Sequence, residues 1–259
     1  MIPRIIHYCW FGRGPKPELF THCYNSWKRY CRNFKIIEWN EDNYDISTAP
    51  LFVQQAYEAG KWAFVTDYVR LDVVYRSGGI YLDTDVEVIR SLRHLLKNKV
   101  FFGLERDEFA ATGLGFGAEK GAEILLEMME DYRDIPFILP DGEYDLTTCP
   151  MRNTDVLLRH GFKRDGSEQL LDGMIHIYPK EVLCPWNDMT GTVDITEKTV
   201  TIHWYSGSWL LEEEQPDRAG YRDFLLRKKR KDSIIEVFGE GGYLFAQKFW
   251  NAVKRLWTD

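Results

Sequence analysis

The chain has 259 residues, of which 44% are hydrophobic and 28% charged, a globular composition that suits one large domain or one domain with an appendage. Its 33 Lys and Arg against 40 Asp and Glu give a net charge of −7, which argues against a nucleic-acid partner. No apolar run approaches the roughly 20 residues of a membrane span, and the N-terminus does not have the pattern of a signal peptide. The five scattered cysteines form no Cys-x-x-Cys pair. We therefore expect a cytoplasmic protein.

Strands and helices are expected to alternate through the first hundred residues. The apolar pattern predicts strands at residues 2–11, 34–39, 80–82, 86–89 and 100–104, and helices at 17–31, 51–58 and 61–76. Later helices are predicted at 119–132 and 153–160, and later strands at 175–178 and 199–204. This order is typical of an α/β fold with a mainly parallel sheet, in which ligands gather at the carboxyl ends of the strands.

The last fifty residues differ from the rest in charge. Residues 210–259 carry ten Lys or Arg and nine Asp or Glu, which leaves 23 against 31 for residues 1–209. This tail contains the basic run 227–231, and residues 243–259 have the spacing of an amphipathic helix with two tryptophans. We therefore expect a catalytic domain at 1–209 and a helical tail at 210–259. The tail is predicted either to rest on an anionic membrane surface or to dock on the body or on a dimer partner.

The sharpest motif is the strand at residues 80–82, entered through Gly78-Gly79 and followed by Asp83-Thr84-Asp85. In an extended backbone, alternate side chains point the same way, so Asp83 and Asp85 are expected to face one side. Mg²⁺ and Mn²⁺ bind through one or two carboxylates and complete their coordination with water and phosphate oxygens. The motif therefore predicts a site for Mn²⁺ or Mg²⁺ with a nucleoside diphosphate, and a solvated turn is the alternative.

A second pair of charged residues precedes this motif. Asp67 and Arg70 are spaced i, i+3 and therefore share one face of the predicted helix. An aspartate can bind a ribose hydroxyl pair, and an arginine offers a bidentate fork to phosphate. The alternative is an ordinary surface ion pair.

These residues carry a resemblance to a known family. The opening segment 2–12, the Asp67-x-x-Arg70 pair and the segment 78–85 together resemble the DXD-containing glycosyltransferases of the family 32 type. That family includes bacterial capsular and lipopolysaccharide sugar transferases and the yeast initiating mannosyltransferase, and the catalytic domains of clostridial glucosylating toxins are similar to it. The resemblance covers residues 1–90 and 199–209. It implies a GT-A-like, Rossmann-like α/β fold.

The resemblance also implies roles for single residues. Trp10 would stack on the donor's base, although core packing is the alternative, and Asp67 would hold the ribose. Arg70 would contact the donor sugar or diphosphate. Asp83 would bridge ribose, sugar and metal-bound water, and Asp85 would be the principal metal ligand.

A last group of candidates follows the predicted strand at 199–204. His203 could supply the third metal ligand, because a neutral imidazole is a good ligand for Mn²⁺. Ser208 and Trp209 resemble the family's loop that closes over the donor diphosphate, where a hydroxyl and an indole N–H can donate to phosphate oxygens. The alternative is a buried histidine beside an aromatic plug, and the toxin relatives use a different ligand set here.

The implied reaction is hexose transfer from a nucleotide-diphosphate sugar, with a UDP-sugar favoured and UDP-galactose as a guess, to a saccharide or lipid-linked saccharide in surface polysaccharide synthesis. The resemblance implies retention of configuration, with front-face attack and double displacement both open. Residues 110–118 resemble the acceptor-side segment and are equally a glycine-rich turn. Location at the inner face of the cytoplasmic membrane would follow from the tail.

Other functions fit the motif less well. A phosphatase of the Asp-x-Asp-x-Thr type needs threonine at position 87, where Glu87 stands. The segment 83–88 also lacks the glycine turn and the twelfth-position glutamate of an EF-hand loop. The alternative that stays open is a non-catalytic or protein-modifying sugar-nucleotide-binding domain.

Overall fold

The computed structural model describes residues 1–187 and 192–206. Its centre is an eight-stranded sheet in the order β2-β1-β3-β7-β5-β9-β8, with β6 paired to β5. The strands are β1 (Ile5–Cys9), β2 (Lys35–Trp39), β3 (Gly79–Tyr81), β5 (Val100–Arg106), β6 (Phe109–Ala111), β7 (Phe116–Ala118), β8 (Gln169–Leu171) and β9 (Ile175–Tyr178). The pairings make β1, β2, β3, β5 and β9 run in one direction, whereas β6, β7 and β8 run in the other.

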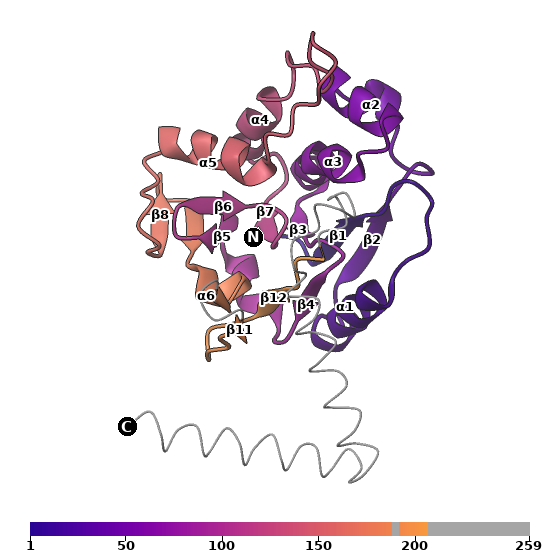
Figure 1. The fold of residues 1–259 in the computed structure, drawn as a ribbon. Coiled ribbons are helices and arrows are strands. Elements are labelled where there is room, and N and C mark those ends of the chain that lie inside the picture. Colours follow the sequence, from indigo (N-terminus) through magenta and orange to yellow (C-terminus); the bar gives the residue numbers. More distant parts are fainter. Residues whose placement is uncertain (188–191, 207–259) are drawn as a thin grey trace.

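Helices cover both faces of this sheet (Figure 1). On one face lie α2 (Leu51–Glu58), α3 (Trp62–Ser77), α4 (Glu123–Glu130) and α5 (Cys149–Arg159). On the other lie α1 (Glu18–Tyr30), α6 (Lys180–Leu183) and the antiparallel pair of β4 (Val86–Val88) with β12 (Thr201–His203). The remaining elements are the 3-10 turns η1 (Ile46–Thr48) and η2 (Leu92–Lys97) and the hairpin of β10 (Trp186–Asn187) with β11 (Thr192–Val193). The predicted α/β fold class, with most strands of the sheet running in one direction, is therefore confirmed.

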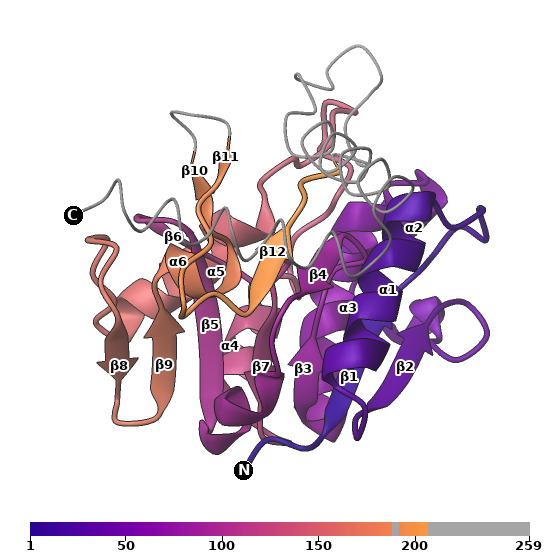
Figure 2. The ribbon, with the colours of Figure 1, turned by 90° about the horizontal axis from the view of Figure 1, so that it is seen from below.

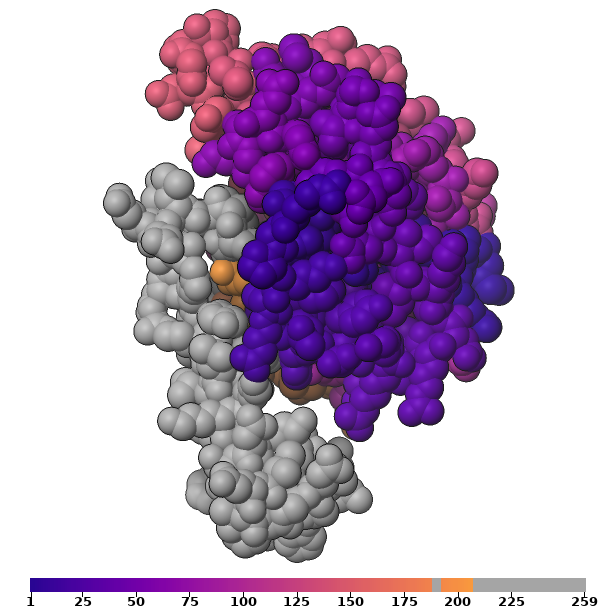
Figure 3. Space-filling model, turned by 90° about the vertical axis from the view of Figure 1, so that its right-hand side faces the viewer, coloured from indigo at the N-terminus to yellow at the C-terminus, as the bar shows by residue number. Residues whose placement is uncertain are grey.

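Two apolar cores lie on the two sides of the sheet. Because side chains alternate along a strand, the neighbours Phe101 and Phe102 enter different cores, and both are completely buried. Trp27 of α1 is completely buried on one side, as is Phe52 of α2 on the other. Figure 3 shows the N-terminal elements, coloured indigo to violet, forming one continuous face of the molecule.

The bounds of the predicted elements agree with the structure for some elements and differ for others. The helix predicted at 51–58 and the strand at 175–178 have the observed bounds, whereas α5 begins at Cys149, four residues before its predicted start. The three-residue strands β6, β7 and β8 were not predicted. In particular, the segment 110–118 is not only a turn, because it contains the end of β6 and all of β7.

The topology gathers several chain segments at one edge of the sheet. β1, β3, β5 and β9 all end at this carboxyl edge (Figure 2), and β12 runs antiparallel to β4 so that the residues after His203 return to the turn that follows β3. Ser208, Trp209 and the predicted tail at 210–259 lie outside the described residues. Within the residues described, no helix is both long and apolar enough to cross a membrane.

A buried histidine lies beneath the two glycines that join α3 to β3. His7 is completely buried, and its Nδ1 accepts a hydrogen bond from the indole N–H of Trp39 at 3.0 Å. Its Nε2–H therefore donates to the carbonyl of Gly78 at 2.9 Å. Gly79 has a φ of 123°, and a Cβ there would lie 2.8 Å from His7 Nε2. Glycine is thus required where the chain passes over the ring.

His7 gives the fold a pH dependence. Burial lowers the pKa of His7 to about 4. The hydrogen bond to Gly78 opposes this shift, and the positive charge of Lys35 adds to it. Between about pH 4 and 6.5 the unfolded chain therefore binds more protons than the native one, so stability falls as the pH falls through this window. At about 1.4 kcal/mol per pKa unit, we expect His7 to contribute about 2 kcal/mol of the loss between pH 6.5 and 5.

Urea titrations at both pH values measure this loss. His7→Gln should be less stable at pH 7, and its stability should change less between the two pH values. An equal pH dependence in both proteins would show that folding does not lower the pKa of His7.

Candidate active site

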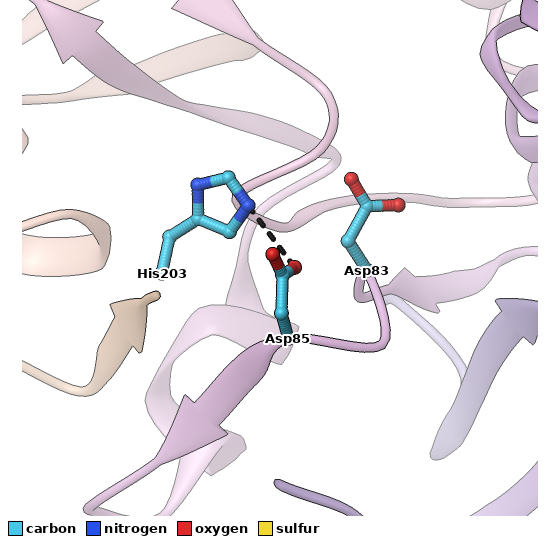
Figure 4. A group of neighbouring side chains, drawn as sticks. All are labelled: Asp83, Asp85 and His203. Atoms are coloured by element: carbon cyan, nitrogen blue, oxygen red, sulfur yellow. Dashed lines mark ion pairs between the residues drawn. The ribbon is translucent and has the colours of Figure 1, made fainter. Parts of the chain in front are cut away.

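Three potential metal ligands meet at the carboxyl edge of β3. Asp83 and Asp85 come from the turn between β3 and β4, and His203 ends β12. One ligand atom from each side chain lies within 4.8 Å of those of the others. Figure 4 shows both carboxylates on one side of the turn, with the His203 ring facing Asp85.

The local backbone differs from the expected one. β3 ends at Tyr81, and the Val86 N–H donates to the carbonyl of Asp83 at 3.0 Å, so the motif forms a turn and not an extended strand. The two carboxylates still share one side. The expected proximity therefore holds, but the alternation of side chains along a strand is not its cause.

Asp85 is held from three directions. It is 8% exposed, and one oxygen lies 3.1 Å from His203 Nε2 while the other accepts the Ser206 N–H at 2.8 Å. Its carbonyl accepts the Trp204 N–H at 3.1 Å. Although burial opposes it, the charge and hydrogen bonds of His203 and Ser206 lower the pKa of Asp85. In turn, Asp85 raises the pKa of His203 against the effect of burial.

This arrangement fits a small divalent cation. Two ligands at right angles around Mg²⁺ or Mn²⁺ lie about 3 Å apart, because metal-to-oxygen distances are about 2.1 Å. The 3.1 Å between Asp85 Oδ1 and His203 Nε2 matches that spacing. Carboxylates together with one imidazole suit Mn²⁺ better than Mg²⁺, which prefers oxygen ligands alone.

Arg70 connects the metal-ligand group to α3. Its guanidinium lies 3.2 Å from Asp67 and 3.3 Å from Asp83, and it donates to the carbonyl and the hydroxyl of Thr66, both at 3.0 Å. A longer contact of 3.7 Å reaches the Cys149 sulfur. Arg70 is 3% exposed and Asp67 8%. The predicted i, i+3 pair therefore forms, but it is a buried network and not a surface ion pair.

Asp83 occupies the centre of these charges. Burial raises the pKa of Asp83 to about 6 against the charge of Arg70, and the Asp85 charge adds to the effect of burial. The Tyr81 hydroxyl donates to its Oδ1 at 3.0 Å. Asp83 thus joins the metal-ligand group to the Arg70 network.

A cleft of about 390 Å³ opens over this centre. Its polar lining residues are Asp67, Arg70, Asp83, Glu105, Arg106, His203 and Tyr205. The other lining residues are largely apolar and include Ala63, Phe64, Phe109, Ala111, Leu114, Pro150 and Met151. A concave site with convergent polar groups and perturbed pKa values is the usual form of a small-molecule site.

Gly113 packs against the charged centre. A Cβ at this position would lie 2.5 Å from Asp83 Oδ2 and 3.1 Å from Arg70 Nη1, and its backbone carbonyl accepts the Asp83 N–H at 3.2 Å. The absence of a side chain at position 113 thus leaves Asp83 room to face the cleft.

We therefore expect Gly113→Ala to displace the Asp83 carboxylate and to weaken Mn²⁺ and UDP binding by about tenfold to a hundredfold, in line with losses of supporting contacts at metal sites. Isothermal titration calorimetry of the folded variant measures the change. Gly14→Ala is the matched control, since a Cβ there meets nothing within 4 Å. Equal affinities in the Gly113 variant and the wild type would mean that Asp83 does not depend on this close packing.

Trp10 lies beyond the end of β1, at the same edge of the sheet. Its indole N–H donates to the Gly14 carbonyl at 2.9 Å, and its ring centroid lies 6.0 Å from that of Phe20. It does not line the cleft described above. The structure therefore brings Asp67, Arg70, Asp83, Asp85 and His203 together, and leaves Trp10 outside the cleft, in contact with Gly14 and Phe20.

Three residues that line the cleft were not among the predicted site residues. Glu105 follows the predicted strand 100–104, so its place after a strand at the carboxyl edge was a usable signal. Tyr205 lies two residues after His203, and only the structure reveals its φ of 47°. Cys149 begins α5 and contacts Arg70 from 79 residues away, and nothing in the sequence indicates this contact.

Comparison with known proteins supports the resemblance to DXD glycosyltransferases. Residues 17–102, about a third of the chain, match the family described as the glycosyltransferase sugar-binding region containing a DXD motif. No curated protein matches the chain in sequence.

Two similar solved structures carry glycosyltransferase titles. The PaToxG glycosyltransferase is 15% identical, with 61% of this chain and 69% of that one covered and a TM-score of 0.47. A glycosyltransferase involved in glycosylation of the major capsid of PBCV-1 is 12% identical, with 86% and 100% covered and a TM-score of 0.47. At these scores neither structure informs the function of this chain.

Proposed function

We propose that the chain is a metal-dependent, retaining hexosyltransferase that uses a nucleotide-diphosphate sugar. The observation that carries the proposal is the meeting of Asp83, Asp85 and His203, within 4.8 Å of one another, beside a cleft that Asp83 and His203 line. Asp83 and Asp85 also lie inside the segment that matches the sugar-binding region. Asp85 and His203 would hold Mn²⁺ or Mg²⁺, with Asp83 as the third ligand. When bound, the ion would neutralise the charge that develops on the departing diphosphate.

The chain's own residues would position the donor. Arg70 is fixed by Asp67, Asp83 and Thr66, so its remaining donor capacity points to a preorganised contact with the donor sugar or diphosphate. Asp67 would bind the ribose, and Trp10 would stack on the base. Ser208 and Trp209 would close over the diphosphate. UDP-hexoses are the favoured donors, and UDP-galactose is our first choice for assay.

The acceptor we propose is a saccharide or lipid-linked saccharide of surface polysaccharide synthesis. The domain at 1–209 would carry out the transfer, and the basic tail at 210–259 would hold the enzyme at the inner face of the cytoplasmic membrane. Co-sedimentation with vesicles rich in phosphatidylserine tests the tail. If neutralising the run 227–231 leaves partitioning unchanged, this part of the proposal is wrong.

Thermal unfolding in the presence of UDP- and GDP-sugars, with and without Mn²⁺, tests the donor proposal. A ligand at a hundred times its Kd should raise the stability of the native state by about 2.7 kcal/mol. We expect a metal-dependent shift with UDP-sugars and slow release of UDP. Metal-dependent binding without any turnover would instead favour the non-catalytic alternative.

A further inference from the structure

A carboxylate that the proposed function does not use lines the cleft beside the metal-ligand group. Glu105 is half-buried near the end of β5, the strand that runs parallel to β3 two positions away in the sheet. Because adjacent strands lie about 4.8 Å apart, the ends of β3 and β5 are about 10 Å apart. β7 lies between these two strands, and Glu105 and Asp83 line the same cleft of about 390 Å³, which has room for a sugar ring.

A β-bulge directs Glu105 toward the cleft. In the pairing of β5 with β6, Leu104 lies opposite Ala110 and Arg106 opposite Phe109, so Glu105 is the extra, unpaired residue. Consecutive residues of a regular strand point to opposite faces, yet Glu105 and Arg106 both line the cleft. Bulges next to active sites commonly redirect a side chain in this way.

Tyr205 connects Glu105 to the metal-ligand group. Its ring centroid lies 4.2 Å from that of His203, and its hydroxyl lies 2.9 Å from the Cys184 sulfur. Burial raises the pKa of the Tyr205 phenol, and the charges of Cys184 and Glu105 add to this shift. The Tyr205 hydroxyl also hydrogen-bonds to Glu105. Tyr205 has a left-handed backbone, with a φ of 47°, and lies between His203 and Ser206, whose N–H donates to Asp85. Glu105 is therefore on the His203 side of the cleft.

We propose that Glu105 is a catalytic residue that binds the acceptor hydroxyl and takes up its proton. This inference rests on the proposed function. The acceptor oxygen forms the new bond to the anomeric carbon while the bond from that carbon to the diphosphate oxygen breaks. The electron pair of the broken bond leaves with the diphosphate, and the acceptor proton moves to a Glu105 oxygen and later to water. Because Glu105 lies on the His203 side, the acceptor enters on the face of the departing diphosphate, and the configuration is retained.

Glu105→Gln in the full-length chain tests this role. With Mn²⁺ and UDP-galactose, and with the other UDP- and GDP-hexoses, water serves as the acceptor and UDP or GDP release is measured. We expect release to fall by about a hundredfold or more, the usual range for a general base, while the affinity for UDP with Mn²⁺ is unchanged. Glu108→Gln is the matched control, since Glu108 is exposed at the tip of the same hairpin.

Azide provides the second readout because it is an anionic acceptor with no proton to lose. In Glu105→Gln, azide should restore nucleotide release and yield a glycosyl azide with the anomeric configuration of the donor. Unchanged hydrolysis by Glu105→Gln, loss of UDP affinity, or a loss of turnover that azide does not restore would each overturn the role of Glu105. If the wild type binds and turns over none of the sugar nucleotides, the proposed function falls as well. Turnover by the wild type with an equally active Glu105→Gln overturns this inference alone.

Discussion

Asp85→Asn should abolish metal-dependent turnover, with a loss of about a thousandfold in the rate of UDP release. The amide keeps the size of the side chain but removes the negative charge. Its single oxygen cannot both accept the Ser206 N–H and bind a cation, whereas a carboxylate has one oxygen for each. A thousandfold loss corresponds to about 4 kcal/mol of transition-state stabilisation, within the range for groups that neutralise developing charge.

The measurement is steady-state UDP release from UDP-hexoses with Mn²⁺, beside Mn²⁺ affinity by calorimetry. Asp134→Asn is the control, because Asp134 is exposed and lies outside the cleft. Turnover by Asp85→Asn within a few fold of the wild type would remove Asp85 from the metal site. Loss of Mn²⁺ affinity with an unchanged melting temperature would support its role as a ligand.

Arg70→Leu should destabilise the protein by about 3–5 kcal/mol, as expected when one partner of a buried ion pair is removed. The substitution leaves Asp67 and Asp83 without the cation that lies 3.2 and 3.3 Å from them. Burial raises the pKa of both carboxyls while Arg70 lowers it, so both pKa values should rise further in the variant. A folded-state pKa above the unfolded value favours the native state at low pH. The deficit relative to wild type should therefore shrink as the pH falls from 7 to 5.

Arg76→Leu is the matched control for this experiment. Arg76 lies on the same helix and pairs with Asp72 at 2.9 Å, but its side chain is 51% exposed. Exposed pairs contribute about 0–1 kcal/mol, so this variant should lose far less. Urea unfolding of the three proteins at both pH values makes the comparison. Equal losses for the two arginine variants would contradict the conclusion that Asp67, Arg70 and Asp83 form a buried charged centre.

The sequence was sufficient to predict the elements that carry the donor-side residues. α3 has a long apolar run that ends before Gly78, and Gly78-Gly79 lead into the short apolar strand β3. The positions of Asp67, Arg70, Asp83 and Asp85 relative to the sheet edge therefore followed from local patterns. The approach of His203 was an expectation from family resemblance, because it depends on the pairing of β12 with β4 across more than a hundred residues. No local pattern contains that pairing.

The acceptor side of the cleft could not be predicted in the same way. Glu105 reaches the cleft through a bulge, and a bulge depends on the register between β5 and β6. The three-residue strand β7 runs between β3 and β5 and lacks the length that makes a periodicity visible. Cys149 meets Arg70 only because α5 packs against β6 at the edge where α3 also lies.

A crystal of the full chain grown with MnCl₂ and UDP gives the decisive result. We predict an anomalous manganese peak between Asp85 and His203, with Asp83 on its coordination shell or one water away and the diphosphate oxygens completing it. A bound UDP whose diphosphate lies away from these three side chains, or a manganese ion held elsewhere while both aspartates face solvent, would contradict the assignment of this cleft as the donor site.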